Sequence, residues 1–142
     1  MKKRDFCLKR ILSFFYFAFF LAFISFSLNA NTKDYQEQFE DVALSIWEYA
    51  EVGYKEYKSS ELLQNILEKE GFNIRNGLAG IPTAFVAEFG KGYPVIGILG
   101  EFDALPGVSQ STSPFKEKYK KNAAGHACGH HLFGAGSAWS AV

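Results

Sequence analysis

The sequence predicts an α/β fold, because helical and strand patterns follow one another along its 142 residues. Apolar residues at three-and-four spacing indicate amphipathic helices over residues 37–50 and 60–70. β-rich residues over 83–89 and a continuous apolar run over 95–99 indicate two strands. The fold that we expect is therefore a set of helices packed on a mixed sheet.

The first helix is predicted from an apolar stripe that faces away from a row of acidic side chains. Gly53 is a plausible stop for this helix. The stripe, which we expect in the core, comprises Phe39, Val42, Ala43, Ile46, Trp47 and Ala50.

The second helix has signals at both of its ends. Ser59 or Ser60 is expected to cap it, and Glu61 suits the positive charge of a helix N-terminus. Gly71 stands where a left-handed residue commonly ends a helix. The buried stripe is predicted to comprise Leu62, Leu63, Ile66 and Leu67.

The two strands are expected to pair as a hairpin around a turn at residues 90–94. The run over 95–99 (VIGIL) is apolar without alternation, which is typical of a strand covered on both faces. A polar loop over 107–124 follows, with solvated lysines over 116–121. The sequence LFGAGSAWSAV at 132–142 predicts a final helix that packs closely through small residues.

Charge and composition exclude several classes of protein. The chain has 15 Lys+Arg and 15 Asp+Glu, so it lacks the basic surplus of a nucleic-acid-binding protein. Apolar residues make up 48% and aromatic residues 17%, which excludes intrinsic disorder.

The first 30 residues read as a targeting segment. A basic start leads into an apolar stretch over 11–26, and small residues then lead to Ala30, after which we expect cleavage. An uncleaved membrane anchor over 11–28 and a buried core helix are the alternatives. The expected domains are a signal peptide, 1–30, and a folded part, 31–142, that is periplasmic or extracellular or anchored to the membrane.

All three histidines lie within six positions of the chain, together with a cysteine. Cys128 and His130 are separated only by Gly129, whose backbone freedom lets both side chains converge on one ion. A thiolate and an imidazole suit zinc and, less well, other first-row divalent ions. His126 and His131 could add ligands, and the alternative is a helix-capping loop with incidental histidines.

Two carboxylates, Glu101 and Asp103, follow the predicted strand over 95–99. On an extended segment, residues two apart point to the same side. The pair could bind a metal, orient a ligand imidazole, or act as a general base; solvated acids at a strand end are the alternative. The GxGxxG and GxSxG motifs are absent, so the sequence gives no support for a nucleotide enzyme or a serine hydrolase.

Taken together, these segments resemble the metal-dependent amidohydrolases of peptidase family M-twenty. The resemblance is carried by EFDALP at 101–106, by GHACGH at 125–130 and by WEYAEVGYKE at 47–56. The branch most similar to it holds aminoacylase-like and auxin-conjugate hydrolases. The resemblance implies a zinc-exopeptidase-like catalytic domain, of which residues 31–142 would be the N-terminal part.

The resemblance also implies roles for individual residues. Cys128 and His130 would be ligands in a site for two divalent ions, Mn²⁺ or Zn²⁺. Asp103 would be the catalytic aspartate behind the metals. Glu101, His126 and His131 would contact the ligands rather than the ions.

The activity implied is hydrolysis of an amide by metal-activated water, on small substrates such as p-aminobenzoyl-glutamate. Alternatives are an aminoacylase or dipeptidase of the same family, or an inactive truncated remnant. In the family, the glutamate general base and further ligands come later in the chain, so the 142-residue chain alone is expected to be inactive. Full-length members are expected to form homodimers or hetero-oligomers, with membrane contact only through the N-terminal segment and no nucleic-acid partner.

Overall fold

The structure is a computed structural model that describes Tyr16 and residues 34–119 and 123–142. The chain divides into two compact units, Met1–Glu37 and Gln38–Val142, and the second holds the features discussed below. The predicted targeting segment lies outside the described residues except for Tyr16. Within the described ranges, no helix is both long enough and apolar enough to cross a membrane.

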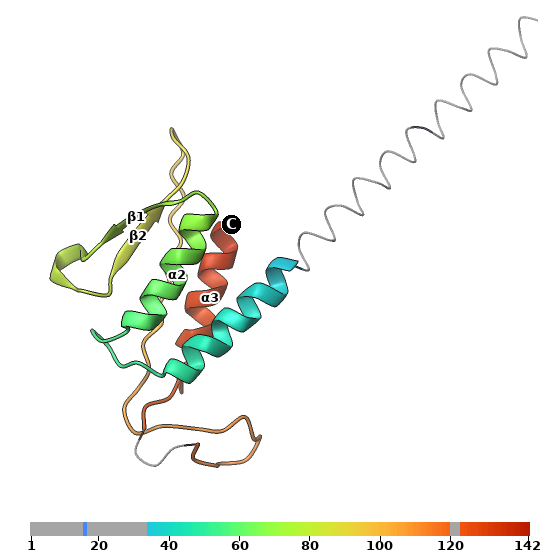
Figure 1. The fold of residues 1–142 in the computed structure, drawn as a ribbon, viewed down its shortest axis with the longest axis vertical. Helices are drawn as coiled ribbons and strands as arrows, with labels where there is room; N and C mark the ends of the chain where they lie inside the picture. Colours follow the sequence, from blue (N-terminus) through green and yellow to red (C-terminus); the bar gives the residue numbers. More distant parts are fainter. Residues whose placement is uncertain (1–15, 17–33, 120–122) are drawn as a thin grey trace, which may run out of the picture. The chain divides into compact units, whose positions relative to one another are not determined.

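Helices and one small sheet make up the described fold, which is of the mixed helix-and-strand class (Figure 1). The two strands are antiparallel, with Asn73 opposite Glu88 and Asn76 opposite Phe85. Helix α2 contacts both strands on one side and α3 on another. After a first helix over residues 34–49, the elements are α2 (Tyr57–Lys69), β1 (Asn73–Asn76), the 3-10 helix η1 (Leu78–Gly80), β2 (Phe85–Glu88) and α3 (His130–Ala141).

The core lies where the first helix, α2 and α3 meet, and it confirms most of both predicted stripes. Ile46 is fully buried, whereas Trp47 is half-buried and packs against Tyr119 with ring centroids 5.5 Å apart. Small residues of α3 allow the close packing expected for that helix. The buried apolar residues are Phe39, Val42, Ala43, Ile46, Leu63, Ile66, Leu67, Ala104, Ala135 and Ala138.

The start of α2 differs from the prediction. The helix begins at Tyr57, so Ser59 and Ser60 lie inside it and are buried rather than capping it. The carboxylate of Glu51 accepts the backbone N–H groups of Lys58 at 3.1 Å and Ser59 at 2.9 Å. A glutamate eight residues before Ser59, outside the helix, thus supplies the acceptor and the negative charge that a helix N-terminus requires.

The end of α2 follows the prediction. Gly71 has a left-handed φ of 89°. Its N–H donates to the Glu68 carbonyl at 3.0 Å, and the Phe72 N–H donates to the Leu67 carbonyl at 3.0 Å. These two bonds form a Schellman motif, which a glycine at this position favours.

The predicted hairpin between 83–89 and 95–99 is wrong. The first of these segments does contain a strand, β2, but its partner is β1, which the sequence patterns did not reveal. Residues 95–99 form no strand, and Ile96 is 83% exposed. An apolar run becomes a buried strand only where other strands flank it, and no described strand lies beside this run. The sheet is therefore antiparallel within the described residues, and not mixed.

The segment over residues 99–105, in contrast, is hydrogen-bonded to other parts of the chain. The N–H of Ala104 donates to the Glu51 carbonyl at 2.7 Å. Leu105 and Gly125 exchange two backbone hydrogen bonds, of 2.9 and 3.0 Å. The hydroxyl of Ser137 in α3 donates to the Leu99 carbonyl at 2.7 Å. These bonds hold Leu99 against α3 at Ser137, and Ala104 and Leu105 against Glu51 and Gly125.

Candidate metal centre

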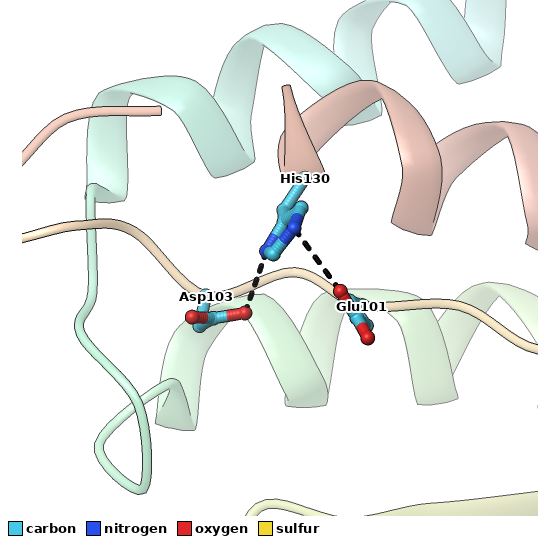
Figure 2. Close-up of side chains that lie close together, drawn as sticks. All are labelled: Glu101, Asp103 and His130. Atoms are coloured by element: carbon cyan, nitrogen blue, oxygen red, sulfur yellow. Dashed lines mark hydrogen bonds and ion pairs between the residues drawn. The ribbon is translucent and has the colours of Figure 1, made fainter. Parts of the chain in front are cut away.

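Three side chains from two parts of the chain meet beside the N-terminus of α3 (Figure 2). Glu101 and Asp103 come from the hydrogen-bonded segment over residues 99–105, and His130 is the first residue of α3. The Nδ1 atom of His130 lies 2.7 Å from Asp103 Oδ1, and its Nε2 atom lies 3.0 Å from Glu101 Oε2. One potential ligand atom from each residue falls within 4.8 Å of the others.

The local backbone explains why both carboxylates reach the same imidazole. Glu101 and Asp103 are two residues apart on a segment that is not helical, and both side chains contact His130, where α3 begins. The approach of α3 needs a glycine, because a Cβ at Gly134 would lie 3.0 Å from the Glu101 carbonyl oxygen and 3.0 Å from Phe102 Cβ. The expectation that the two carboxylates share one side is confirmed.

A neutral His130 imidazole has only one N–H and so cannot donate a hydrogen bond to both carboxylates. A neutral imidazole has one N–H and one lone pair. The shorter contact, to Asp103, is typical of an N–H donated to a carboxylate. The Nε2 lone pair would then face a carboxylate oxygen of Glu101, which is repulsive. A second proton or a cation between Nε2 and Glu101 removes the repulsion, so this donor set fits a divalent ion.

Cys128 is not among these three residues, and its thiol is exposed. It lies in the turn that leads into α3, where Gly129 has a left-handed φ of 75°. Gly129 thus adopts a backbone conformation that favours glycine, in line with the backbone freedom expected there. The role of Cys128 as a ligand stays a prediction, as does that of Asp103 in catalysis.

His126 and His131 lie close to each other, with ring centroids 5.0 Å apart. The Nε2 atom of His126 lies 3.0 Å from the carbonyl oxygen of Ile46, in the first helix. Burial lowers the pKa of His126 below its usual value; the bond to Ile46 and the charge of Asp103 oppose this change, and His130 reinforces it. Burial, followed by the charge of His126, also lowers the pKa of His131.

Glu51 supports the centre, and the sequence patterns gave it no role. Its carboxylate caps α2, and its carbonyl accepts the Ala104 N–H next to Asp103. The only sequence signal was its place in the family-like segment 47–56. Local patterns could not reveal either bond, because a cap is expected directly before its helix, whereas Glu51 lies eight residues before Ser59, and because Ala104 is distant in the sequence.

Comparison with known proteins gives several relatives. The chain is 39% identical over 110 residues to a subunit of the p-aminobenzoyl-glutamate hydrolase of Escherichia coli (strain K12), covering 75% of this chain and 22% of that protein. It is 32% identical over 105 residues to the thermostable carboxypeptidase 1 of Saccharolobus solfataricus, and the match covers 72% of this chain and 26% of that protein. It is 31% identical over 97 residues to the hippurate hydrolase of Campylobacter jejuni, and the match covers 68% of this chain and 25% of that protein. No protein-family model matches the chain.

The chain thus spans about a quarter of the length of the curated relatives that it matches. These relatives are named as hydrolases or peptidases, and the match takes in more than two thirds of this chain in each case. On this evidence, the chain belongs to the M-twenty family of amidohydrolases.

Proposed function

We propose that the chain carries part of the metal centre of an amidohydrolase that cleaves N-acyl or aminobenzoyl amino acids. The observation that carries the proposal is the His130 imidazole held between two carboxylates, at 2.7 and 3.0 Å. The names of the relatives support amides of amino acids, including p-aminobenzoyl-glutamate and hippurate, as substrates.

In this proposal, His130 Nε2 and Glu101 Oε2 hold a divalent ion, so Glu101 is itself a ligand and not, as the resemblance implied, only a contact of the ligands. Asp103 accepts the Nδ1–H of His130, which fixes the ring orientation and raises the basicity of the ligand nitrogen. Cys128 is the further ligand predicted from the sequence. Two ions, Mn²⁺ or Zn²⁺, are proposed from the resemblance; a bound ion of this kind lowers the pKa of water and polarises a carbonyl group.

The residues of this chain contribute positioning and charge rather than proton transfer. With both carboxylates engaged by His130, neither is free to act as the general base. We therefore propose that the base comes from a part of the catalytic domain outside residues 31–142. Hydrolysis of N-acyl amino acids in the manner of an aminoacylase or dipeptidase is the alternative within the same chemistry, and an inactive remnant is the alternative outside it.

Metal binding by the 142-residue chain tests the proposal directly. Titration calorimetry with Zn²⁺ and Mn²⁺ should detect binding, and Glu101→Gln should weaken it at least about tenfold. Glu61→Gln is the matched control, because Glu61 is exposed on α2 and is not among the three residues of the centre. Equal affinity of the Glu101 variant and the control would remove Glu101 from the ligand set.

Two further variants divide the roles of the other residues. Cys128→Ser should lower bound metal, measured by plasma emission analysis, because a thiolate ligand is lost. Asp103→Asn should leave the fold intact and weaken metal binding less than Glu101→Gln does. In a family-length protein, Asp103→Asn should also reduce turnover; unchanged turnover would leave Asp103 with a structural role.

Activity measurements test whether the 142-residue chain is active without the rest of a family-length protein. We expect no turnover of p-aminobenzoyl-glutamate or hippurate by the 142-residue chain above a metal-only control. Turnover above that control would show that the chain contains its own base. Export through residues 1–30 and assembly with further subunits are also part of the proposal; the name of the Escherichia coli relative describes it as one subunit of its enzyme.

A further inference from the structure

Glu51 lies in the short connection between the first helix and α2, and the backbone of this connection is strained. Ala50 has a φ of 44° and Tyr54 a φ of 65°, in the left-handed region that residues other than glycine rarely adopt. Such conformations persist only where the surrounding structure holds them. Glu51, which lies between these two residues, makes hydrogen bonds in two directions.

The carboxylate of Glu51 is bound to the first turn of α2. Its Oε2 atom accepts the Ser59 N–H at 2.9 Å and the Ser59 hydroxyl at 2.8 Å. Its Oε1 atom accepts the Lys58 N–H at 3.1 Å. Ser59 is fully buried, so water does not compete for its hydroxyl. These bonds fix the Glu51 side chain relative to α2.

The carbonyl group of Glu51 is bound to the segment that carries Asp103. It accepts the Ala104 N–H at 2.7 Å, and Val52 and Ala104 form an isolated β-bridge. Asp103 immediately precedes Ala104, and its side chain is 32% exposed, so packing alone does not fix where its carboxylate lies. The bond to Glu51 fixes the backbone from which that carboxylate reaches His130 Nδ1 at 2.7 Å.

We propose that Glu51 is a positioning residue for the metal centre, which sets the place of Asp103 by linking it to the first turn of α2. This inference rests on the proposed metal-binding function. Asp103 orients the His130 imidazole for an ion on Nε2, so a shift of the Asp103 backbone changes the orientation of that ring. Loss of the Glu51 carboxylate releases the strained connection, and the change reaches the centre through Ala104.

A second glutamate at the start of α2 provides a matched control. Thr83 donates its hydroxyl to Glu56 Oε2 at 2.7 Å, as Ser59 does to Glu51 Oε2 at 2.8 Å. Thr83 is 4% exposed and Ser59 is 0% exposed. The bond between Glu56 and Thr83 joins the start of α2 to the segment before β2. Thr83→Val therefore removes a buried bond of the same kind and leaves the link to Ala104 intact.

Hydrogen exchange of the Ala104 amide in the metal-free 142-residue chain tests the link itself. The Gly125 amide is the internal reference, because global destabilisation speeds the exchange of both amides. Relative to this reference, Ala104 exchange should rise about tenfold in Glu51→Ala and about threefold in Ser59→Ala, but less than about twofold in Thr83→Val. An unchanged ratio in Glu51→Ala would overturn the proposal.

Zinc affinity, measured by calorimetry, tests the consequence for the centre. Glu51→Ala should weaken zinc binding about threefold to tenfold, which is less than the loss expected when a group that touches the ligand is removed. Thr83→Val should stay within about twofold of the natural chain. Equal losses in the two variants would mean that Glu51 acts only through stability, and the positioning role would be wrong.

The outcomes distinguish this inference from the function on which it rests. If the natural chain binds no zinc, the proposed function fails and the positioning role fails with it. If the natural chain binds zinc and Glu51→Ala binds it equally well, the positioning role alone is wrong. If circular dichroism shows that Glu51→Ala does not fold, Ser59→Ala and Thr83→Val decide the question, and equal Ala104 exchange in these two variants would also overturn the inference.

Discussion

Two neighbouring stretches of one chain, 95–98 and 101–105, differ sharply in their surroundings. The first is more apolar in sequence, yet Val95 is 78% exposed and Ile96 is 83% exposed. The second is more polar, yet Ala104 is 2% exposed and is bonded to Glu51. The comparison shows that apolar character does not bury a segment without neighbours. The stretch with the buried Ala104 and the backbone hydrogen bonds is also the one that carries the candidate centre.

Hydrogen exchange should show the largest contrast between the two stretches. The backbone N–H groups of Leu105 and Gly125 are hydrogen-bonded to each other's carbonyl groups. We expect their amides to exchange roughly a hundredfold or more slowly than those of 96–98, which make no such bond among the described residues. Equal protection of both stretches, measured by NMR or mass spectrometry, would show that 96–98 has a partner in solution.

Gly125→Ala should have the next largest effect. A Cβ at this position would lie 2.6 Å from the Val108 carbonyl oxygen and 2.9 Å from Ser109 Cα, and these backbone atoms cannot move independently. The pairing with Leu105 should be disrupted, and the free energy of unfolding should fall by about 1–3 kcal/mol in urea denaturation. An unchanged urea midpoint would mean that this close approach is relaxed in solution.

Gly134→Ala should have a smaller effect on stability but a specific one on the centre. The new Cβ would press on the backbone of Glu101 at 3.0 Å, while alanine favours the helix by about 1 kcal/mol. We expect a net loss of about 1 kcal/mol, together with weaker zinc binding.

Gly136→Ala is the matched control for this variant, because nothing lies within 4 Å of a Cβ there. It should stabilise α3 by up to about 1 kcal/mol and leave zinc binding unchanged. Equal zinc affinity in the two variants would contradict the link between Gly134 and Glu101.

Ile96→Ala should have the smallest effect. Because Ile96 is 83% exposed, its truncation should change the free energy of unfolding by no more than about 0.5 kcal/mol. Leu63→Ala, at a side chain only 2% exposed, should cost about 2–5 kcal/mol in the same denaturation measurement. A large loss for Ile96→Ala would show that the exposed stretch is buried in solution.

Local patterns predicted what depends on neighbours in the sequence. The stripe around Ile46 and the left-handed end at Gly71 were both predicted and found. The cap of α2 and the partner of β2 were predicted wrongly. The capping carboxylate belongs to Glu51, eight residues before Ser59, and the strand that pairs with β2 precedes it in the chain instead of following it. Glu51 carries no local signal for its capping role.

The sequence alone predicted where the helices lie and the resemblance to the family, and it placed Glu101, Asp103 and His130 among a longer set of candidate site residues that also included Cys128, His126 and His131. Spacing alone left open whether Glu101 and Asp103 would meet the histidines. The tertiary structure decided that both contact His130, while Cys128 remains exposed. The physical reason is that hydrophobic periodicity acts within one helix or strand, whereas a site is assembled by hydrogen bonds and close approaches between segments, such as that of Gly134 to Glu101.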